Sequence, residues 1–201
     1  MAAVLETLKQ SPFQTRLLTG QTGVEINDIR LQDMSDENVE ATRRLVGEYC
    51  VGVFPNQNLS PEDQLEFVSR FGKITKTPGV DMRSGVDFVH VVADRGDPDH
   101  PVSGGFHTDT CFVETPPSFS TLHAIDVPSH GGDTIFCNQY MAYDSLSDVM
   151  KSWLEGMRFK HVVSGTDRPE EVPDPVWHPA VRTHPVTLRK ALYVTLSLIH
   201  I

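Results

Sequence analysis

Residues 106–112 read Phe-His-Thr-Asp-Thr-Cys-Phe, and the fold is expected to form around this stretch. His107 and Asp109 are two residues apart, so on a β-strand their side chains would point to the same face. A neutral imidazole and a carboxylate suit divalent iron, and a third ligand from elsewhere would complete a facial triad. The spacing alone is unspecific, because a chain with nine histidines produces His-x-Asp by chance. Whether this His-x-Asp pair binds a metal is therefore judged from the surrounding sequence.

The size and composition of the chain are those of an ordinary globular protein. Its 201 residues fit one domain, which we expect to span residues 1–201. A formal net charge of -10 without a basic cluster argues against nucleic-acid binding. Three widely spaced cysteines indicate reduced thiols rather than a disulfide framework or a zinc site. Without a signal-like or membrane-length apolar run, we expect a soluble, cytoplasmic protein with no membrane contact. Homo-oligomerisation is left open.

Three helices are predicted from their start and stop signals. Each begins after a serine that can cap the helix, with an acidic residue in the first turn, where the helix dipole favours negative charge. The second helix also has Pro61 at its first position and Asp63 three residues after the cap. The predicted helices run from the cap Ser35 to about residue 50, from the cap Ser60 to Gly72, and from the cap Ser147 to about residue 155.

Most of the remaining chain is expected to form short strands. Apolar and polar residues alternate in several segments, and Gly and Pro turns separate them. The predicted strands cover residues 23–29, 51–54, 86–93, the His107 stretch, 118–126, 134–137, 158–164 and 191–195, with loops at 94–102 and 169–179. This pattern predicts a mainly β fold with flanking helices (α+β), specifically a jelly roll or cupin-like barrel.

Several motifs, taken in order, resemble the TauD/TfdA family of iron(II)- and 2-oxoglutarate-dependent dioxygenases. No single motif is diagnostic, but together they cover roughly residues 20 to 195 in the family's order. The motifs are Gly-Val-Phe at 52–54, Gln-Asn-Leu-Ser-Pro-Glu at 57–62, Phe-Gly at 71–72, His-Thr-Asp at 107–109, Pro-Pro at 116–117, Val-Pro-Ser at 127–129, Gly-Gly-Asp-Thr at 131–134, Ala-Tyr-Asp-Ser-Leu-Ser at 142–147 and His-Pro-Ala-Val-Arg-Thr-His-Pro at 178–185.

The resemblance implies a double-stranded β-helix that holds Fe(II) and 2-oxoglutarate and acts on a small molecule with O₂. His107 and Asp109 would be two of three iron ligands. Thr134 matches the family residue whose hydroxyl binds a carboxylate of 2-oxoglutarate. Phe112 would line the substrate pocket, although a core aromatic role is the alternative. The enzyme would hydroxylate a small anionic substrate of the taurine, alkylsulfonate or aryloxyalkanoate type.

Thr77 marks a departure from the taurine-oxidising members. In those enzymes a histidine that holds the sulfonate follows the Phe-Gly motif, and Thr77 occupies the corresponding position here. The resemblance therefore does not extend to taurine itself. An anion of another shape is expected, with Lys76 as a candidate partner for its charge.

A second departure concerns the end of the family pattern. In the family, the third iron ligand and the arginine that binds 2-oxoglutarate come from a later block, which this chain lacks. Leu188 replaces an expected glycine, and His200 stands too early to substitute for the ligand. We therefore expect an incomplete jelly roll, a C-terminally truncated fragment that is inactive alone. The alternatives are a non-redox cupin-type metal hydrolase or isomerase, and a non-catalytic binding protein of the same fold.

Overall fold

The structure is a computed structural model that describes residue 8 and residues 11–77, 84–92, 106–162 and 176–194. The chain divides into two compact units, each assembled from separate segments. Unit 1 consists of Met1–Lys73, Ile125–Asn138 and Thr183–Arg189, and unit 2 of Ile74–Ala124, Gln139–Arg182 and Lys190–Ile201. No described helix is long and apolar enough to cross a membrane.

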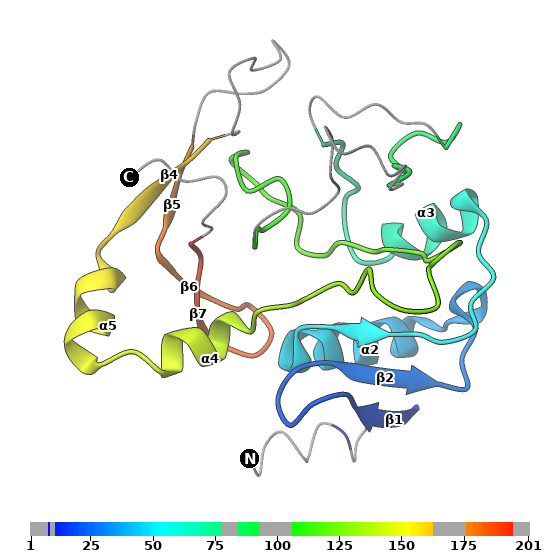
Figure 1. Cartoon of the computed structure of the whole chain (residues 1–201), viewed down its shortest axis with the longest axis horizontal. Helices are drawn as coiled ribbons and strands as arrows, with labels where there is room; N and C mark the ends of the chain where they lie inside the picture. The colour runs from blue at the N-terminus through cyan, green and yellow to red at the C-terminus, as the bar shows by residue number, and fades with distance from the viewer. Residues whose placement is uncertain (1–7, 9–10, 78–83, 93–105, 163–175, 195–201) are drawn as a thin grey trace. The chain divides into compact units, whose positions relative to one another are not determined.

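In unit 1, the residues that the structure describes after residue 10 form a three-stranded sheet and the helices α2 and α3 (Figure 1). Strand β1 (Gln14–Leu17) pairs antiparallel with β2 (Val24–Asn27), and β2 pairs parallel with β3 (Gly52–Val53). A 3₁₀ turn, η1 (Leu31–Asp33), leads into helix α2 (Asp36–Tyr49), and helix α3 (Pro61–Ser69) follows β3.

The core of unit 1 lies between α2 and the sheet and extends to α3. One buried cluster joins the sheet residues Val24 and Ile26 to Leu45 and Tyr49 of α2. Alternate β2 residues face this cluster, as the two-residue strand period requires. A second buried cluster fixes η1 and α3 against the start of α2, and comprises Leu31, Met34, Val39 and Phe67.

The described residues of unit 2 form short helices and short strands. Helix α4 (Gln139–Asp144) precedes helix α5 (Asp148–Glu155). Strand β4 (Arg158–His161) pairs antiparallel with β5 (Val176–Pro179), and β6 (Val181–Thr183) forms a second sheet with β7 (Lys190–Leu192). Glu155 at the end of α5 accepts hydrogen bonds from the Tyr143 hydroxyl at 2.8 Å and from Lys190 Nζ at 2.5 Å. This carboxylate therefore links α4, α5 and β7.

The three predicted helices are confirmed at their caps. Ser35, Ser60 and Ser147 each accept a hydrogen bond from a backbone N–H in the first turn. The second helix ends at Ser69, a few residues before Gly72. The short helix α4 and strands β1 and β6 were not predicted.

Several predicted strands are wrong. The described residues of the segments 86–93, 118–126 and 134–137, and of the His107 stretch, form no strand. Conversely, Val176–Pro179 forms β5, where a loop was predicted. The strands predicted at 23–29, 51–54, 158–164 and 191–195 have counterparts in β2, β3, β4 and β7. The loop predicted at 94–102, residues 169–175 of the other loop, and His200 lie outside the described residues.

Candidate metal and substrate site

Asp109 begins a turn and His107 lies in the irregular segment just before it, so neither is on a strand, and their side chains nevertheless converge. His107 Nε2 is 3.2 Å from Asp109 Oδ1, and each side chain is about half exposed (50% and 52%). The expected strand would have placed them on one face through its two-residue period. Here they converge although no strand forms, so the predicted proximity holds although its predicted cause is wrong.

The backbone immediately after Asp109 reverses direction. Thr110 has a φ of 50°, in the left-handed region that β-branched residues rarely adopt, and the Val113 N–H donates to the Thr110 carbonyl at 3.3 Å. The next two side chains are buried: Cys111 is fully buried and Phe112 is 8% exposed. This left-handed turn is the reason why no strand forms here. The pocket-lining role of Phe112 stays a prediction.

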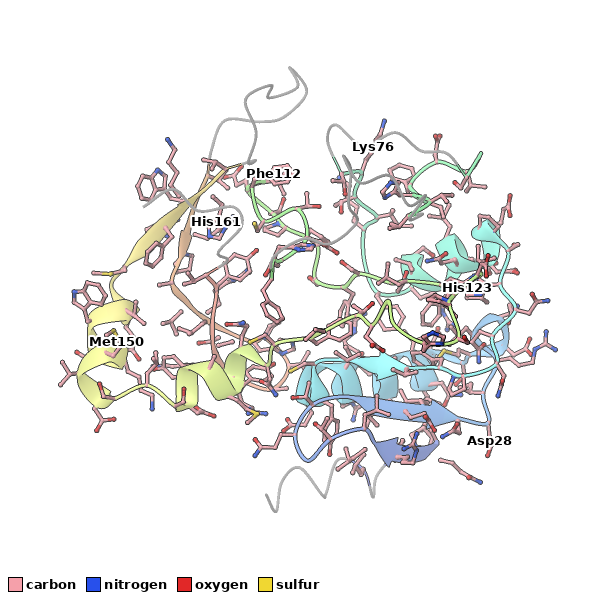
Figure 2. The ribbon with its side chains drawn as sticks, viewed as in Figure 1. Asp28, Lys76, Phe112, His123, Met150 and His161 are labelled. Atoms are coloured by element: carbon pink, nitrogen blue, oxygen red, sulfur yellow. The ribbon has the colours of Figure 1, made fainter. Side chains whose placement is uncertain are left out.

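Thr77 lies beside this turn. Its Oγ1 is 3.2 Å from the Oγ1 of Thr110, and either hydroxyl can donate. The residue predicted to line the substrate pocket is thus joined by a hydrogen bond to the residue that follows Asp109. Lys76, the candidate partner for an anion, is exposed (Figure 2).

Thr134 belongs to unit 1, whereas His107 and Asp109 belong to unit 2. It follows a turn in which Gly131 and Gly132 both have positive φ angles, 78° and 71°. These angles explain the paired glycines, because residues with a Cβ are strained there. Thr134 itself is exposed in an extended segment.

A buried cluster of His161, His178 and Tyr193 is a feature of unit 2 that the sequence did not predict. The two imidazole rings are 5.1 Å apart at their centroids, and Tyr193 lies 5.4 Å from the first and 5.5 Å from the second. His178 Nε2 donates to the Val113 carbonyl at 3.0 Å, which ties β5 to the end of the His107–Val113 turn. Burial, and secondarily the charge of His178, lowers the pKa of His161 to about 4, so that His161 is neutral at neutral pH.

The motif at residues 178–185 has residues in both units. His178 belongs to the buried cluster, and the Arg182 guanidinium lies 4.5 Å from the centre of the Tyr193 ring. His184 is in unit 1, where its Nδ1 accepts from the backbone N–H groups of Val186 and Thr187. The sequence feature that relates to this cluster is Pro179, which restricts His178 to an extended backbone conformation.

Among the described residues, no group of three or more His, Cys, Asp or Glu side chains is arranged to hold a metal ion. His107 and Asp109 therefore form a pair in this part of the chain. An imidazole nitrogen and a carboxylate oxygen that converge in this way are a donor set that fits a divalent transition metal.

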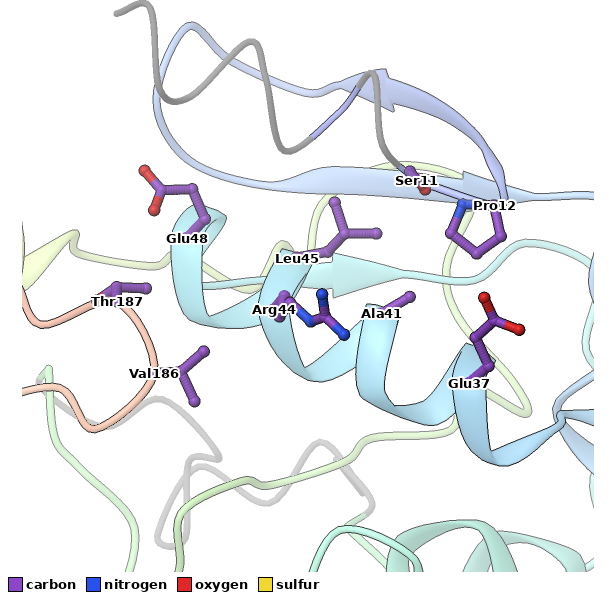
Figure 3. Close-up of a pocket in the computed structure, with 9 residues that line it drawn as sticks. All are labelled: Ser11, Pro12, Glu37, Ala41, Arg44, Leu45, Glu48, Val186 and Thr187. Atoms are coloured by element: carbon purple, nitrogen blue, oxygen red, sulfur yellow. The ribbon is translucent and has the colours of Figure 1, made fainter.

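Two cavities lie away from the predicted site residues. A cavity of about 330 Å³ in unit 1 runs along α2, and Figure 3 shows Arg44, Glu37 and Glu48 around it. A cavity of about 280 Å³ in unit 2 lies beside β5, with Trp177, Arg158 and Glu114 in its wall. Neither is lined by His107, Asp109, Thr77, Phe112 or Thr134.

Comparison with known sequences gives a consistent set of relatives. A sequence model of the "Taurine catabolism dioxygenase TauD, TfdA family" matches residues 14–201. An "alpha-ketoglutarate-dependent sulfonate dioxygenase" of Saccharomyces cerevisiae is 32% identical over 206 residues, covering 90% of this chain and 49% of the relative. An "alpha-ketoglutarate-dependent 2,4-dichlorophenoxyacetate dioxygenase" of Cupriavidus pinatubonensis is 33% identical, covering 89% of this chain and 71% of the relative. The chain thus spans about half the length of the yeast relative.

Solved structures agree with the sequence relatives. AAD-2, crystallised with Mn(II) and N-oxalylglycine, superposes with a TM-score of 0.76 over 92% of this chain and 74% of its own, at 24% identity, which supports a shared fold. A taurine dioxygenase from Burkholderia xenovorans superposes with a TM-score of 0.70 over 94% of this chain and 65% of its own, at 25% identity. The ordered motifs, the sequence match over most of the chain and these superpositions lead to one conclusion: the chain belongs to the TauD/TfdA dioxygenase family.

Proposed function

We propose that this chain forms part of an Fe(II)- and 2-oxoglutarate-dependent dioxygenase that hydroxylates a small anionic organic molecule. The observation that carries the proposal is the convergence of His107 Nε2 and Asp109 Oδ1 at 3.2 Å in a chain of this family. The names of the relatives support the cofactor and the reaction class, since they are 2-oxoglutarate-dependent dioxygenases of sulfonates and of an aryloxyacetate.

His107 and Asp109 would hold the metal. A neutral imidazole donates the lone pair of Nε2, and the carboxylate offsets part of the charge of the cation. When bound, iron with 2-oxoglutarate supplies the oxidative chemistry with O₂, and 2-oxoglutarate leaves as succinate and CO₂. Thr134 would donate a hydrogen bond from its hydroxyl to a carboxylate of 2-oxoglutarate. The protein's own task is to position the cofactor and the substrate for this chemistry.

The substrate is proposed to be an organic anion other than taurine, of the alkylsulfonate or aryloxyalkanoate type. Relatives described as acting on sulfonates and 2,4-dichlorophenoxyacetate support this class, as does an alkylsulfatase of Acinetobacter baylyi at 29% identity. Thr77 is bonded to the turn that follows Asp109, which supports its place near the site. Phe112 would present an apolar surface to the organic part of the substrate.

The fold is proposed to be the jelly roll of the family, formed as one domain. The superposition on AAD-2 supports it. The third iron ligand and the arginine for 2-oxoglutarate are proposed to come from further sequence, since 51% of the yeast relative lies outside its match to this chain (100% minus 49%). A cytoplasmic location is proposed as well, and it is supported by the three cysteines, all of which are free thiols.

The proposal is tested by metal and cofactor binding. Mn(II), titrated into the chain and followed by electron paramagnetic resonance, should bind weakly, and His107→Ala or Asp109→Ala should abolish the binding. His130→Ala, at an exposed histidine in unit 1, serves as the matched control and should leave it unchanged.

Cofactor chemistry requires a longer form of the protein. Anaerobic Fe(II) with 2-oxoglutarate should then give a weak visible charge-transfer band, and O₂ should convert 2-oxoglutarate to succinate when the substrate anion is present. Metal binding without the band would instead favour a cupin-type hydrolase or isomerase. Absence of metal binding in both forms would favour a non-catalytic binding protein.

A further inference from the structure

Burial does not explain why the side chains of Asp109 and His107 lie next to each other. Both side chains are about half exposed, so packing does not fix their rotamers. The backbone of the turn that begins at Asp109, together with the groups that hold that backbone, therefore contributes to their relative position. The residues around Asp109 are therefore candidates for a role in positioning this carboxylate.

Thr110 is the residue with the unusual backbone. It has a φ of 50° and is 7% exposed, so a β-branched side chain occupies a left-handed conformation in a buried position. Such a conformation persists only where the surroundings hold it, and it is typical of functional sites. Because Thr110 directly follows Asp109, this φ sets the direction in which the chain leaves the proposed ligand.

The hydroxyl of Thr110 has a partner in a distant segment of unit 2. Thr110 Oγ1 is 3.2 Å from Thr77 Oγ1, and 33 residues separate the two. The turn is held at its other end by His178 Nε2, which donates to the Val113 carbonyl at 3.0 Å. Between these two points Cys111 is fully buried. The turn is thus anchored at both ends and in the middle.

We propose that Thr110 and Thr77 are positioning residues for the divalent metal: their paired hydroxyls hold the left-handed turn that keeps Asp109 beside His107. This inference rests on the proposed function of His107 and Asp109 as metal ligands. It gives Thr77 a role that needs no contact with substrate.

The test removes each hydroxyl and leaves the shape of the side chain. Thr110→Val and Thr77→Val are isosteric, and valine keeps the β-branch that makes φ of 50° costly at position 110. Each variant should weaken Mn(II) binding about fivefold. The double variant should bind as each single variant does, because all three lose the same hydrogen bond. Thr110→Ser, which keeps the hydroxyl, should restore most of the affinity.

The control is Thr15→Val, which makes the same chemical change at a partly buried threonine in β1 of unit 1. The thermal midpoint in EDTA should shift no more for Thr110→Val and Thr77→Val than for this control. Unchanged Mn(II) affinity in the two variants, additive losses in the double variant, or a fall in thermal midpoint that parallels the loss of affinity would each overturn the proposal.

A metal-free measurement separates this inference from the proposed function. Amide hydrogen exchange at Val113, whose N–H donates to Thr110, reports on the turn in EDTA. Faster exchange in Thr110→Val and Thr77→Val than in Thr15→Val supports the hydroxyl pair as the element that holds the turn, and unchanged exchange overturns it. Wild-type protein that binds no Mn(II) overturns the proposed function instead, while the exchange data still decide the role of the pair.

Discussion

At the residue scale, His161 combines deep burial with unpaired polar atoms. Its side chain is 1% exposed, and neither ring nitrogen has a hydrogen-bond partner in the part of the chain that the structure describes. It is surrounded by His178 and Tyr193, and Arg182 lies over the tyrosine ring. Burial disfavours the protonated imidazole, which is why its pKa falls to about 4.

This burial predicts acid sensitivity. Because the unfolded pKa of histidine is near 6.5 and the folded pKa of His161 is about 4, the unfolded state binds more protons between these values. The contribution is fully present above about pH 6.5 and is lost as the pH falls toward 4. Between pH 7 and pH 5 the loss should be roughly 2 kcal/mol of unfolding free energy.

The variant His161→Phe should remove most of that loss, because phenylalanine keeps the ring and cannot be protonated. Urea unfolding at pH 7 and pH 5 measures the difference, with His130→Phe at an exposed site as the control. Burial also lowers the pKa of His184, so some pH dependence of the same sign should remain. An equal pH dependence in wild type and His161→Phe would contradict the assignment.

Residue-scale predictions from sequence succeeded where the chemistry is local. The two-residue spacing of His107 and Asp109 led us to expect their proximity on a strand, and the structure has the proximity without the strand. The hydroxyl pair of Thr77 and Thr110 was not predictable, because a hydrogen bond across 33 residues leaves no local pattern. The left-handed φ of Thr110 was not predictable either, since threonine ordinarily avoids that region.

At the scale of elements, the helices follow from capping chemistry. The Ser60 hydroxyl accepts from the Asp63 N–H at 3.1 Å, and Asp63 Oδ2 accepts in turn from the Ser60 N–H at 2.9 Å. These reciprocal bonds form a capping box, and they lower the pKa of the Asp63 carboxyl. The signal lies within four residues, so it could be identified from the sequence.

Replacing this cap should weaken unit 1. Ser60→Ala removes the acceptor for the Asp63 N–H and should cost about 1 kcal/mol of unfolding free energy, whereas Ser60→Asp should retain most of it. Urea unfolding at pH 7 measures both changes. Since Asp63 has a lowered pKa, its own contribution is present above pH 3.8 and is lost as the pH falls below that value. Equal stability of the two variants would show that the cap does not matter.

The strands were predicted less well, because a strand needs a partner as well as a pattern. Residues 118–126 alternate polar and apolar side chains but form no strand in the described structure. In contrast, β4 forms because it pairs antiparallel with β5. The Phe159–His178 pair of that ladder spans residues far apart in sequence. Alternation indicates that a segment can form a strand, and only non-local pairing makes it one.

At the scale of the whole molecule, an irregular segment exposes large apolar side chains. Ile125 is 85% exposed and Ile135 is 72% exposed, and Leu122, Val127 and Phe136 are also exposed. Residues 124–137 all fall in the exposed class. Exposed apolar side chains of this kind favour association with other chains.

We expect this chain to bind the dye 8-anilinonaphthalene-1-sulfonate and to self-associate as its concentration rises, because apolar surface is open to both. The double variant Ile125→Lys, Ile135→Lys should lower dye fluorescence about twofold and raise the concentration needed for association. Sedimentation velocity measures the association. Thr15→Lys adds a charge in a different segment, and an equal effect from it would argue against a specific role of the exposed segment.

The segmented make-up of unit 1 has a consequence for synthesis on the ribosome. Its first 73 residues emerge early, but Thr183–Arg189 leaves the exit tunnel more than 100 residues later. Arg189 Nη1 pairs with Glu48 on α2 at 3.1 Å, so that helix stays without this neighbour until residue 189 has been translated. A nascent chain whose native contacts form this late is expected to bind chaperones. Slow codons before residue 183 would lengthen the delay.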